Sequence, residues 1–116
     1  MAHDIFSPQP VKEAQVYLMR RLLNDFPDEA VSEILQNTKA AMGTDSRLLI
    51  SEVMLPESVV PGEHAASHWL NFAAMAIGGR VRTVQEYKAL LDEAGLAVEN
   101  VYTCVGQCMM VEAKSK

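Results

Sequence analysis

Residues 47–55 read RLLISEVML, and this stretch decides the fold. The run is apolar almost throughout, as in a parallel-sheet strand that is buried on both faces, and Glu52 is its one acidic interruption. Residues 16–19, VYLM, form a second short β-type segment that stops at the charged pair Arg20-Arg21. A helical pattern separates the two segments. The sequence therefore predicts two neighbouring parallel strands joined through a helix.

The helices are predicted from their end signals. The first covers residues 27–43, with a proline in its first turn and a glycine at its end. The second covers residues 64–79, which are apolar on almost every side and close with Gly78-Gly79. The third follows a capping box formed by Thr83 and Glu86. Each helix thus has a clear beginning or end in the sequence.

Two further strands, at about residues 97–103 and 107–113, complete the pattern. The order strand, helix, strand, helix, helix, strand, strand predicts an α/β fold of about four strands flanked by helices. Two strands are parallel and linked by a right-handed crossover, and a C-terminal antiparallel hairpin follows. The chain of 116 residues is 49% hydrophobic and 22% charged, which fits a single domain over residues 1–116.

The charge of the chain excludes two classes of partner. The net charge is −5 and the isoelectric point is near 5.1, whereas nucleic acid and anionic membranes attract clustered Lys and Arg. The opening MAHDIFSPQP lacks the features of a signal peptide, and no apolar run approaches the roughly 20 residues of a membrane span. We therefore expect a cytoplasmic protein with neither nucleic acid nor membrane as a partner.

Three ordered stretches carry a family resemblance: YLMRRLLNDFPDEA at 17–30, LLISEVMLPE at 48–57 and GGRVRTVQEYKALLDEAGL at 78–96. Together with HDIFSPQPVKEA at 3–14, they resemble the C-terminal half of the fungal and plant small-molecule O-methyltransferases that use S-adenosylmethionine. The resemblance implies half of a class I methyltransferase sheet of the Rossmann-like type. It also implies a phenolic or polyketide small molecule as the substrate class.

The resemblance implies that this chain binds no cofactor by itself. The family holds S-adenosylmethionine with a glycine-rich loop after its first strand and an acidic residue after its second, both upstream of the matching part. The paired glycines Gly78-Gly79 follow a helix and so cannot form that loop. Asp4 falls where the family has a residue near the adenine, and one contact cannot hold the cofactor alone. We expect no cofactor.

The family's catalytic positions can be carried over one at a time. The histidine that takes the proton from the substrate hydroxyl falls at Asn24, whose amide does not titrate. The first of two acidic residues that orient this histidine falls at Glu52 and is retained, whereas the second falls at Val81. The resemblance therefore predicts a chain that does not transfer methyl groups.

Asn24, Asp25 and Glu52 are expected near the carboxyl ends of adjacent parallel strands, where open α/β sheets bind ligands. Asp25 and Glu52 are candidate catalytic residues, and Asn24 and Arg20 are candidate substrate contacts. In a second interpretation, Asp25 only caps the following helix and Glu52 is bonded to backbone amides. The residues leave both interpretations open.

His64 and His68 are four residues apart, so a helix places both on one face. Two histidines without a third ligand are a weak metal signal, so we expect no metal and treat both as candidate acid or base residues. Larger apolar residues on the same helix are expected in the core, or alternatively in a ligand wall or dimer contact: Trp69, Phe72, Met75 and Ile77.

Two functions follow as hypotheses. The first is a cofactor-independent cyclase of secondary metabolism, which closes a lactone or pyrone ring on a polyketide with the acid and base residues of the former substrate pocket. The second is an accessory subunit that docks on a polyketide synthase or a methyltransferase without catalysis. The resemblance also implies that the first strand has an open edge, because the strand that pairs with it in the family lies upstream of the matching part. An open edge predicts a homodimer or another protein partner.

Overall fold

The computed structural model describes residues 1–63, 65–105 and 108–116. Its elements follow the predicted order: β1 (Val16–Arg20), a 3₁₀ turn η1 (Leu23–Asp25), α1 (Asp28–Lys39), β2 (Arg47–Val53), α2 (Ala65–Ala76), α3 (Val84–Glu93), β3 (Leu96–Thr103) and β4 (Cys108–Ser115). The predicted α/β class with four strands is confirmed.

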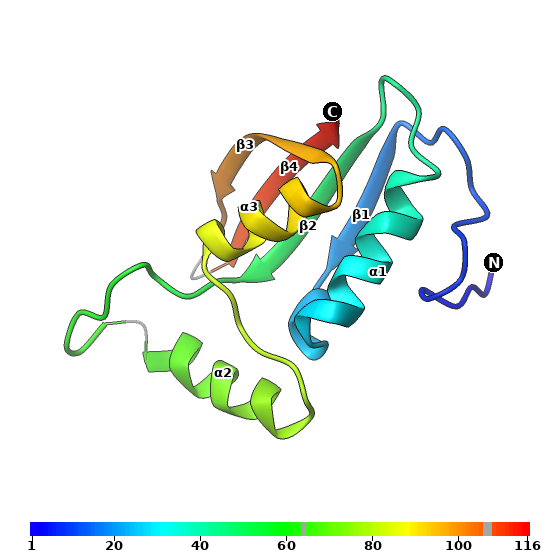
Figure 1. Cartoon of the computed structure of the whole chain (residues 1–116). Helices are drawn as coiled ribbons and strands as arrows, with labels where there is room; N and C mark the ends of the chain where they lie inside the picture. Colours follow the sequence, from blue (N-terminus) through cyan, green and yellow to red (C-terminus); the bar gives the residue numbers. More distant parts are fainter. Residues whose placement is uncertain (64, 106–107) are drawn as a thin grey trace.

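The four strands form one open sheet in the order β1-β2-β4-β3. β1 and β2 are parallel, with Leu18 opposite Leu49, and β4 runs antiparallel to both of its neighbours. The C-terminal hairpin therefore turns back into the sheet, so that β4 lies beside β2 and β3 forms the outer edge. This places the carboxyl ends of β1 and β2 together at one end of the sheet (Figure 1).

One face of the sheet is covered by α1 and α3, which contact each other (Figure 1). The core lies between these helices and the sheet. It contains alternate residues of β1, β2 and β4 together with the inner sides of the helices: Tyr17, Met19, Ile34, Leu35, Leu48, Ile50, Leu90, Leu91, Val111 and Ala113. Strand alternation and helical spacing thus bring one apolar layer together.

The other face of the sheet and the free edge of β1 are uncovered in the described part of the chain. Val16 and Leu18 are 51% and 60% exposed, although both belong to a β-type apolar segment. An unpaired apolar edge strand invites association with another chain.

α2 lies apart from the other two helices, beyond the carboxyl end of β2 (Figure 1). Its outward side carries Trp69, Phe72 and Met75, of which Trp69 is 72% exposed, and the Trp69 and Phe72 rings make an edge-to-face contact. The expectation that these residues and Ile77 belong to the core is therefore wrong. An all-round apolar helix predicts burial, but here only one side of α2 meets the rest of the protein.

Element ends moved by a few residues from their predicted positions. α1 ends at Lys39, with Ala40 as its C-cap, instead of continuing to Gly43. The third helix begins as predicted, because the Thr83 hydroxyl accepts from the Glu86 N–H and the Glu86 carboxylate accepts from the Thr83 N–H. None of the described helices is long and apolar enough to cross a membrane, and the cytoplasmic location stays a prediction.

Candidate functional site

A pocket of about 280 Å³ lies where β1 and β2 end, between these strands and α2. We call it the strand-end pocket. Its strand-side wall is formed by Arg21, Asn24, Asp25, Glu52 and Val53, and its apolar wall by Leu70, Ala73, Ala74 and Ile77. Asn24, Asp25 and Glu52, which the sequence predicts to lie together, all line this one pocket.

Glu52 is nearly inaccessible to solvent, with 2% of the residue exposed, at the end of β2. Its Oε1 accepts hydrogen bonds from the backbone N–H groups of Leu22 and Leu23, at 2.7 and 2.8 Å. The carboxylate thus holds the start of η1, where unpaired N–H groups favour an anion. Burial nevertheless raises the pKa of Glu52 above its usual 4.5, since it outweighs the backbone hydrogen bonds.

A raised pKa has a consequence for stability. A carboxyl whose pKa is higher in the folded chain favours folding while it is protonated, and this contribution is lost as the pH rises through the folded pKa. We expect Glu52→Gln to remove this loss, so that the stability of the variant relative to the wild type increases from pH 4.5 to pH 8. Urea unfolding at several pH values measures the difference. Glu33→Gln on the exposed side of α1 is the control, and equal pH profiles for both variants would contradict the prediction.

Asn24 is buried, and its side chain is bonded on both sides. Nδ2 donates to the Val53 carbonyl oxygen at 3.0 Å, and Oδ1 accepts from the Tyr87 hydroxyl at 2.6 Å. Burial is also the main cause that raises the pKa of Tyr87, so its hydroxyl stays a donor. Because an amide has two N–H donors, one N–H of Asn24 has no recorded partner within the described residues.

Asp25 is exposed at the rim of the pocket. The interpretation that Asp25 caps the following helix is wrong: Pro27 is the N-cap of α1, and no side chain caps it. The reason is that η1 ends at Asp25 and two further residues intervene before α1. Arg20 is exposed at the end of β1 and is not among the pocket residues, whereas its neighbour Arg21 is.

Arg82 fixes the turn that carries Asn24 and Asp25. Its side chain is fully buried, and Nε and Nη2 both donate to Asp28 Oδ1, at 2.9 and 2.7 Å. Nη1 donates to the Leu23 carbonyl and Nη2 to the Phe26 carbonyl, at 3.0 and 2.8 Å. The guanidinium thus joins both sides of the turn. Sequence reasoning missed this role, because nothing in the local pattern distinguishes a buried arginine from an exposed one.

Gly79 brings the end of α2 against the same turn. A Cβ at this position would lie 2.1 Å from the Asn24 carbonyl oxygen, and the next N–H, of Arg80, donates to that oxygen at 3.0 Å. Val81 is buried, and its N–H donates to the Asn71 side chain. The connection from α2 to α3 therefore closes one side of the strand-end pocket.

The remaining predicted site residues lie elsewhere. Trp69, Phe72 and Met75 are absent from the pocket lining, and the structure does not bring them together with Asn24 or Glu52. His68 is half-buried outside this lining, and its Nε2 is buried without a partner among the described residues. His64 lies outside the described residues. In the described part of the chain, no three His, Cys, Asp or Glu side chains are grouped as metal ligands.

Three residues of the apolar wall, Leu70, Ala73 and Ala74, were also missed, whereas Ile77 was among the residues considered for a ligand wall. Leu70, Ala73, Ala74 and Ile77 recur at helical spacing, so the sequence did contain a signal for one face of this helix. The large residues between them drew attention to the opposite side. Side-chain size therefore selected Trp69, Phe72 and Met75, which lie outside the lining of this pocket.

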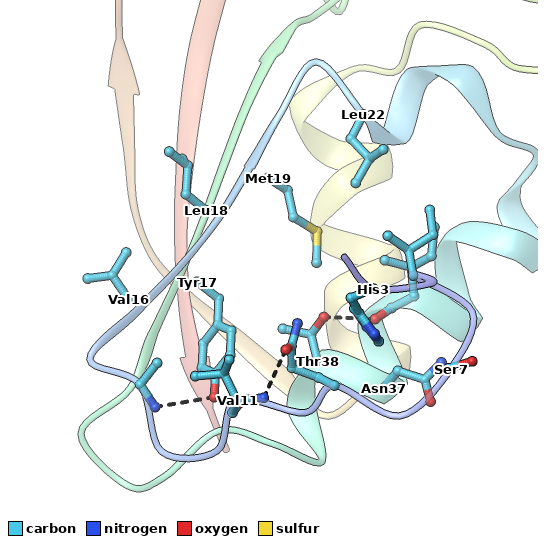
Figure 2. A pocket seen from close by; sticks show the side chains of 14 residues that line it. His3, Ser7, Val11, Val16, Tyr17, Leu18, Met19, Leu22, Asn37 and Thr38 are labelled. Atoms are coloured by element: carbon cyan, nitrogen blue, oxygen red, sulfur yellow. Dashed lines mark hydrogen bonds between the residues drawn. The ribbon is translucent and has the colours of Figure 1, made fainter. Parts of the chain in front are cut away.

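A second cavity, of about 340 Å³, lies along the free edge of β1 (Figure 2). Its walls come from the N-terminal segment, β1 and α1. Figure 2 shows Met19, Thr38 and Asn37 around it. The Tyr17 hydroxyl donates to the Val11 carbonyl oxygen at 2.8 Å on one side of the cavity. Asn37 Nδ2 is buried without a partner among the described residues. This cavity thus follows the strand edge that no described strand covers.

Comparisons with known proteins identify the family. A model of the O-methyltransferase domain matches residues 1–97. The O-methyltransferase desB of Aspergillus desertorum is 46% identical over 118 residues, which cover 100% of this chain and 27% of desB. The demethylsterigmatocystin 6-O-methyltransferase stcP of Emericella nidulans is 43% identical over 86% of this chain and 48% of its own length.

Solved structures agree with these relatives. LaPhzM superposes with a TM-score of 0.91 at 32% identity, over 100% of this chain and 34% of that chain. A protein described as a pericyclic reaction enzyme has the same TM-score and identity, and the match covers 100% of this chain and 30% of that protein. The chain spans about a quarter of desB and corresponds to the C-terminal half of the family fold. This chain belongs to the O-methyltransferase domain family.

Proposed function

We propose that this chain is a member of the family that does not transfer methyl groups. In this proposal it binds a phenolic or polyketide molecule in the strand-end pocket and promotes ring closure by acid and base catalysis. The observation that carries the proposal is the pairing of a buried Glu52 carboxyl of raised pKa with Asn24 at the place of the family's proton-accepting histidine.

Asn24 supports the first part of the proposal. An amide cannot accept the proton of a phenol, and the hydrogen bonds with Tyr87 and Val53 hold this neutral group in place. Val81, at the place of the family's second acidic residue, is also uncharged and buried. Two positions that serve proton transfer in the family therefore cannot serve it here.

Glu52 supports the second part. A buried carboxyl of raised pKa exchanges protons closer to neutral pH than an exposed one, which suits acid and base catalysis. The apolar wall from α2 fits a flat, unsaturated ring, and the pocket of about 280 Å³ fits a small molecule. One relative of the same fold is described as a pericyclic reaction enzyme, so chemistry other than methyl transfer occurs on it.

The proposed reaction is the closure of a pyrone on a poly-β-keto thioester. The Glu52 carboxylate takes the proton of an enol hydroxyl, and the enol oxygen attacks the thioester carbonyl carbon. The remaining N–H of Asn24 donates to the carbonyl oxygen as negative charge develops on it. The C–O bond forms, the C–S bond breaks, and the leaving thiolate receives the proton from Glu52.

A synthetic triketide thioester of N-acetylcysteamine tests this function. We expect the wild-type chain to form the pyrone above the uncatalysed rate, and Glu52→Gln to lose this excess about 100-fold, since a general base contributes at least that much. Glu33→Gln on α1 is the matched control, in which the same charge is removed far from the pocket. Equal rates in all three proteins would disprove the role of Glu52. Methylation of a phenol with added S-adenosylmethionine would disprove the proposal itself.

The uncovered surface of the sheet supports a separate proposal, that the chain pairs with another protein chain. Exposed Val16 and Leu18 line the free edge of β1, and Trp69 and Phe72 stand out on α2. The proposed partner is a second copy, in which an antiparallel pair of β1 strands centred on Leu18 places Val16 of one copy opposite Arg20 of the other. Light scattering of the wild-type chain determines whether such a dimer forms.

A further inference from the structure

The ladder between β3 and β4 continues one residue beyond β3. Thr103 is opposite Met109 in the register, and the Cys104 N–H donates to the Cys108 carbonyl oxygen at 3.0 Å. The next pair in the same register is therefore Cys104 opposite Cys108. These are the two cysteines of the chain, and both thiols are free.

Both thiols project from the uncovered face of the sheet. The Cys108 Sγ lies 3.5 Å from the Oγ of Ser51, which belongs to the neighbouring strand β2. On β3, the Tyr102 hydroxyl donates to Glu112 Oε2 at 2.7 Å, so Tyr102 shares its face with Glu112. Side chains two or four residues apart along a strand lie on the same face, which places Cys104 with Tyr102 and Cys108 with Glu112.

A pair at this position suits a disulfide. Residues directly opposite each other in an antiparallel ladder have Cα atoms about 4.5–5.5 Å apart. Disulfides join residues whose Cα atoms are about 4.4–6.8 Å apart and whose Cβ atoms point the same way. Cys104 is exposed and Cys108 half-buried, so at least one thiol is accessible to a reagent in solution.

The geometry points to a reversible redox site, in which Cys104 and Cys108 form an intramolecular disulfide by exchange with a low-molecular-weight disulfide such as glutathione disulfide. The Cys104 thiolate attacks the glutathione disulfide, forms a mixed disulfide and releases one glutathione thiol. The Cys108 thiolate then attacks the Cys104 sulfur and releases the second. The chain gives up two electrons and two protons, and one glutathione disulfide becomes two glutathione thiols.

A disulfide between Cys104 and Cys108 would lie beside the strand-end pocket. Cys108 is the register partner of Val53, which lines that pocket and accepts the hydrogen bond from Asn24. A disulfide would tie the ends of β3 and β4 together next to the end of β2. This inference rests on the β-ladder alone and is independent of the proposed reaction.

The test is incubation of the whole chain with glutathione disulfide, followed by alkylation with iodoacetamide and intact mass measurement. We expect the wild type to lose two hydrogens, to take up no alkylating reagent and to map to a Cys104–Cys108 peptide link. The Cys108→Ser variant should stop at the mixed disulfide on Cys104. We expect at least about tenfold more glutathione adduct on this variant than on the wild type, because the second step is intramolecular.

Three results would overturn the inference. They are a lasting glutathione adduct on the wild type at the level of the variant, a disulfide between two chains on a non-reducing gel, and full alkylation of both cysteines after incubation. Return of both free thiols on addition of reduced glutathione is expected as well, and a bond that resists it would show that the site is not reversible.

Discussion

Replacement of Arg82 by alanine is expected to lower the free energy of unfolding by about 3–5 kcal/mol, because a large, fully buried side chain is lost and backbone carbonyl groups around it lose a hydrogen-bond donor. The change removes both Arg82 donors to Asp28 Oδ1, so Asp28 keeps only the longer contact with Arg80 at 3.7 Å. The Phe26 carbonyl oxygen loses its Nη2 donor, and the Leu23 carbonyl oxygen keeps only the N–H of Phe26. Domains of this size are stable by only about 5–15 kcal/mol, so the loss is a large part of the total. Urea unfolding followed by circular dichroism measures it.

The control for this prediction is Arg47→Ala. Arg47 pairs with Glu112 at 3.5 Å, but its side chain is 37% exposed, and such pairs contribute below about 1 kcal/mol. If Arg82→Ala does not fold, Arg82→Lys keeps the charge but loses the forked geometry, and it should still be less stable than the wild type. Equal stability of Arg82→Lys and the wild type would contradict the role of the guanidinium.

Replacement of Gly79 by alanine is the second large expected effect, with a loss of about 3 kcal/mol in unfolding free energy. The new Cβ would lie 2.1 Å from the Asn24 carbonyl oxygen and 2.6 Å from the Asp25 carbonyl carbon, both backbone atoms. Because backbone cannot rotate away as a side chain can, the end of α2 must shift from the turn. Denaturant unfolding gives the stability, and hydrogen exchange at Asn24 and Asp25 reports the displaced turn.

Gly43→Ala is the matched control. A Cβ at Gly43 would be 3.4 Å from the nearest atoms of Glu13, an ordinary contact, so we expect a change below about 1 kcal/mol. Gly78 is a less suitable control because its φ of 89° strains any L-residue. If Gly79→Ala and Gly43→Ala unfold at the same denaturant concentration, the close approach of α2 to the turn is disproved.

Arg82 and Gly79 act on the same short segment of the chain. Arg82 holds the carbonyl groups on either side of Asn24 and Asp25, Glu52 holds the N–H groups before them, and the connection after α2 closes over Asn24. The turn is thus fixed from three directions. Such over-determination is what a catalytic or binding position requires, because side chains there must be held within a fraction of an ångström.

The elements themselves could be predicted well from the sequence. The apolar run at 47–55 gave β2, and the capping box at Thr83 gave the start of α3, because both signals depend on neighbours within one turn or one strand. The end of α1 was less well predicted: Gly43 follows a short turn and not the helix itself. Helix ends depend on competing caps that differ by little in free energy.

The strand order could not be predicted. A hairpin at the C-terminus can join a sheet through either of its strands, and local pattern does not distinguish them. The structure pairs β4 with β2, which places Val111 and Ala113 opposite Ile50 and Leu48 in the buried layer. That choice depends on packing against α1 and α3, and so on the whole chain.

The candidate site was predicted in part. Glu52 and Asn24 were found because they interrupt or follow apolar strands, which is a signal within the sequence. Arg82 and most of the apolar wall from α2 were not found. The role of Arg82 depends on residues more than 50 positions away, and the wall depends on which side of a helix faces inward. Trp69, Phe72 and Met75 were chosen for their size, which does not specify direction.

The sequence by itself determined the α/β class, the parallel pair of strands, the family and the loss of a titratable group at Asn24. These follow from periodicity, from short-range capping and from the identities of single residues. Only the tertiary structure decided that Asn24 is bound by Tyr87, that Arg82 is buried under the turn, and that Cys104 faces Cys108. The physical reason is that hydrogen bonds and burial depend on distances in space, which the spacing along a chain fixes only within one element.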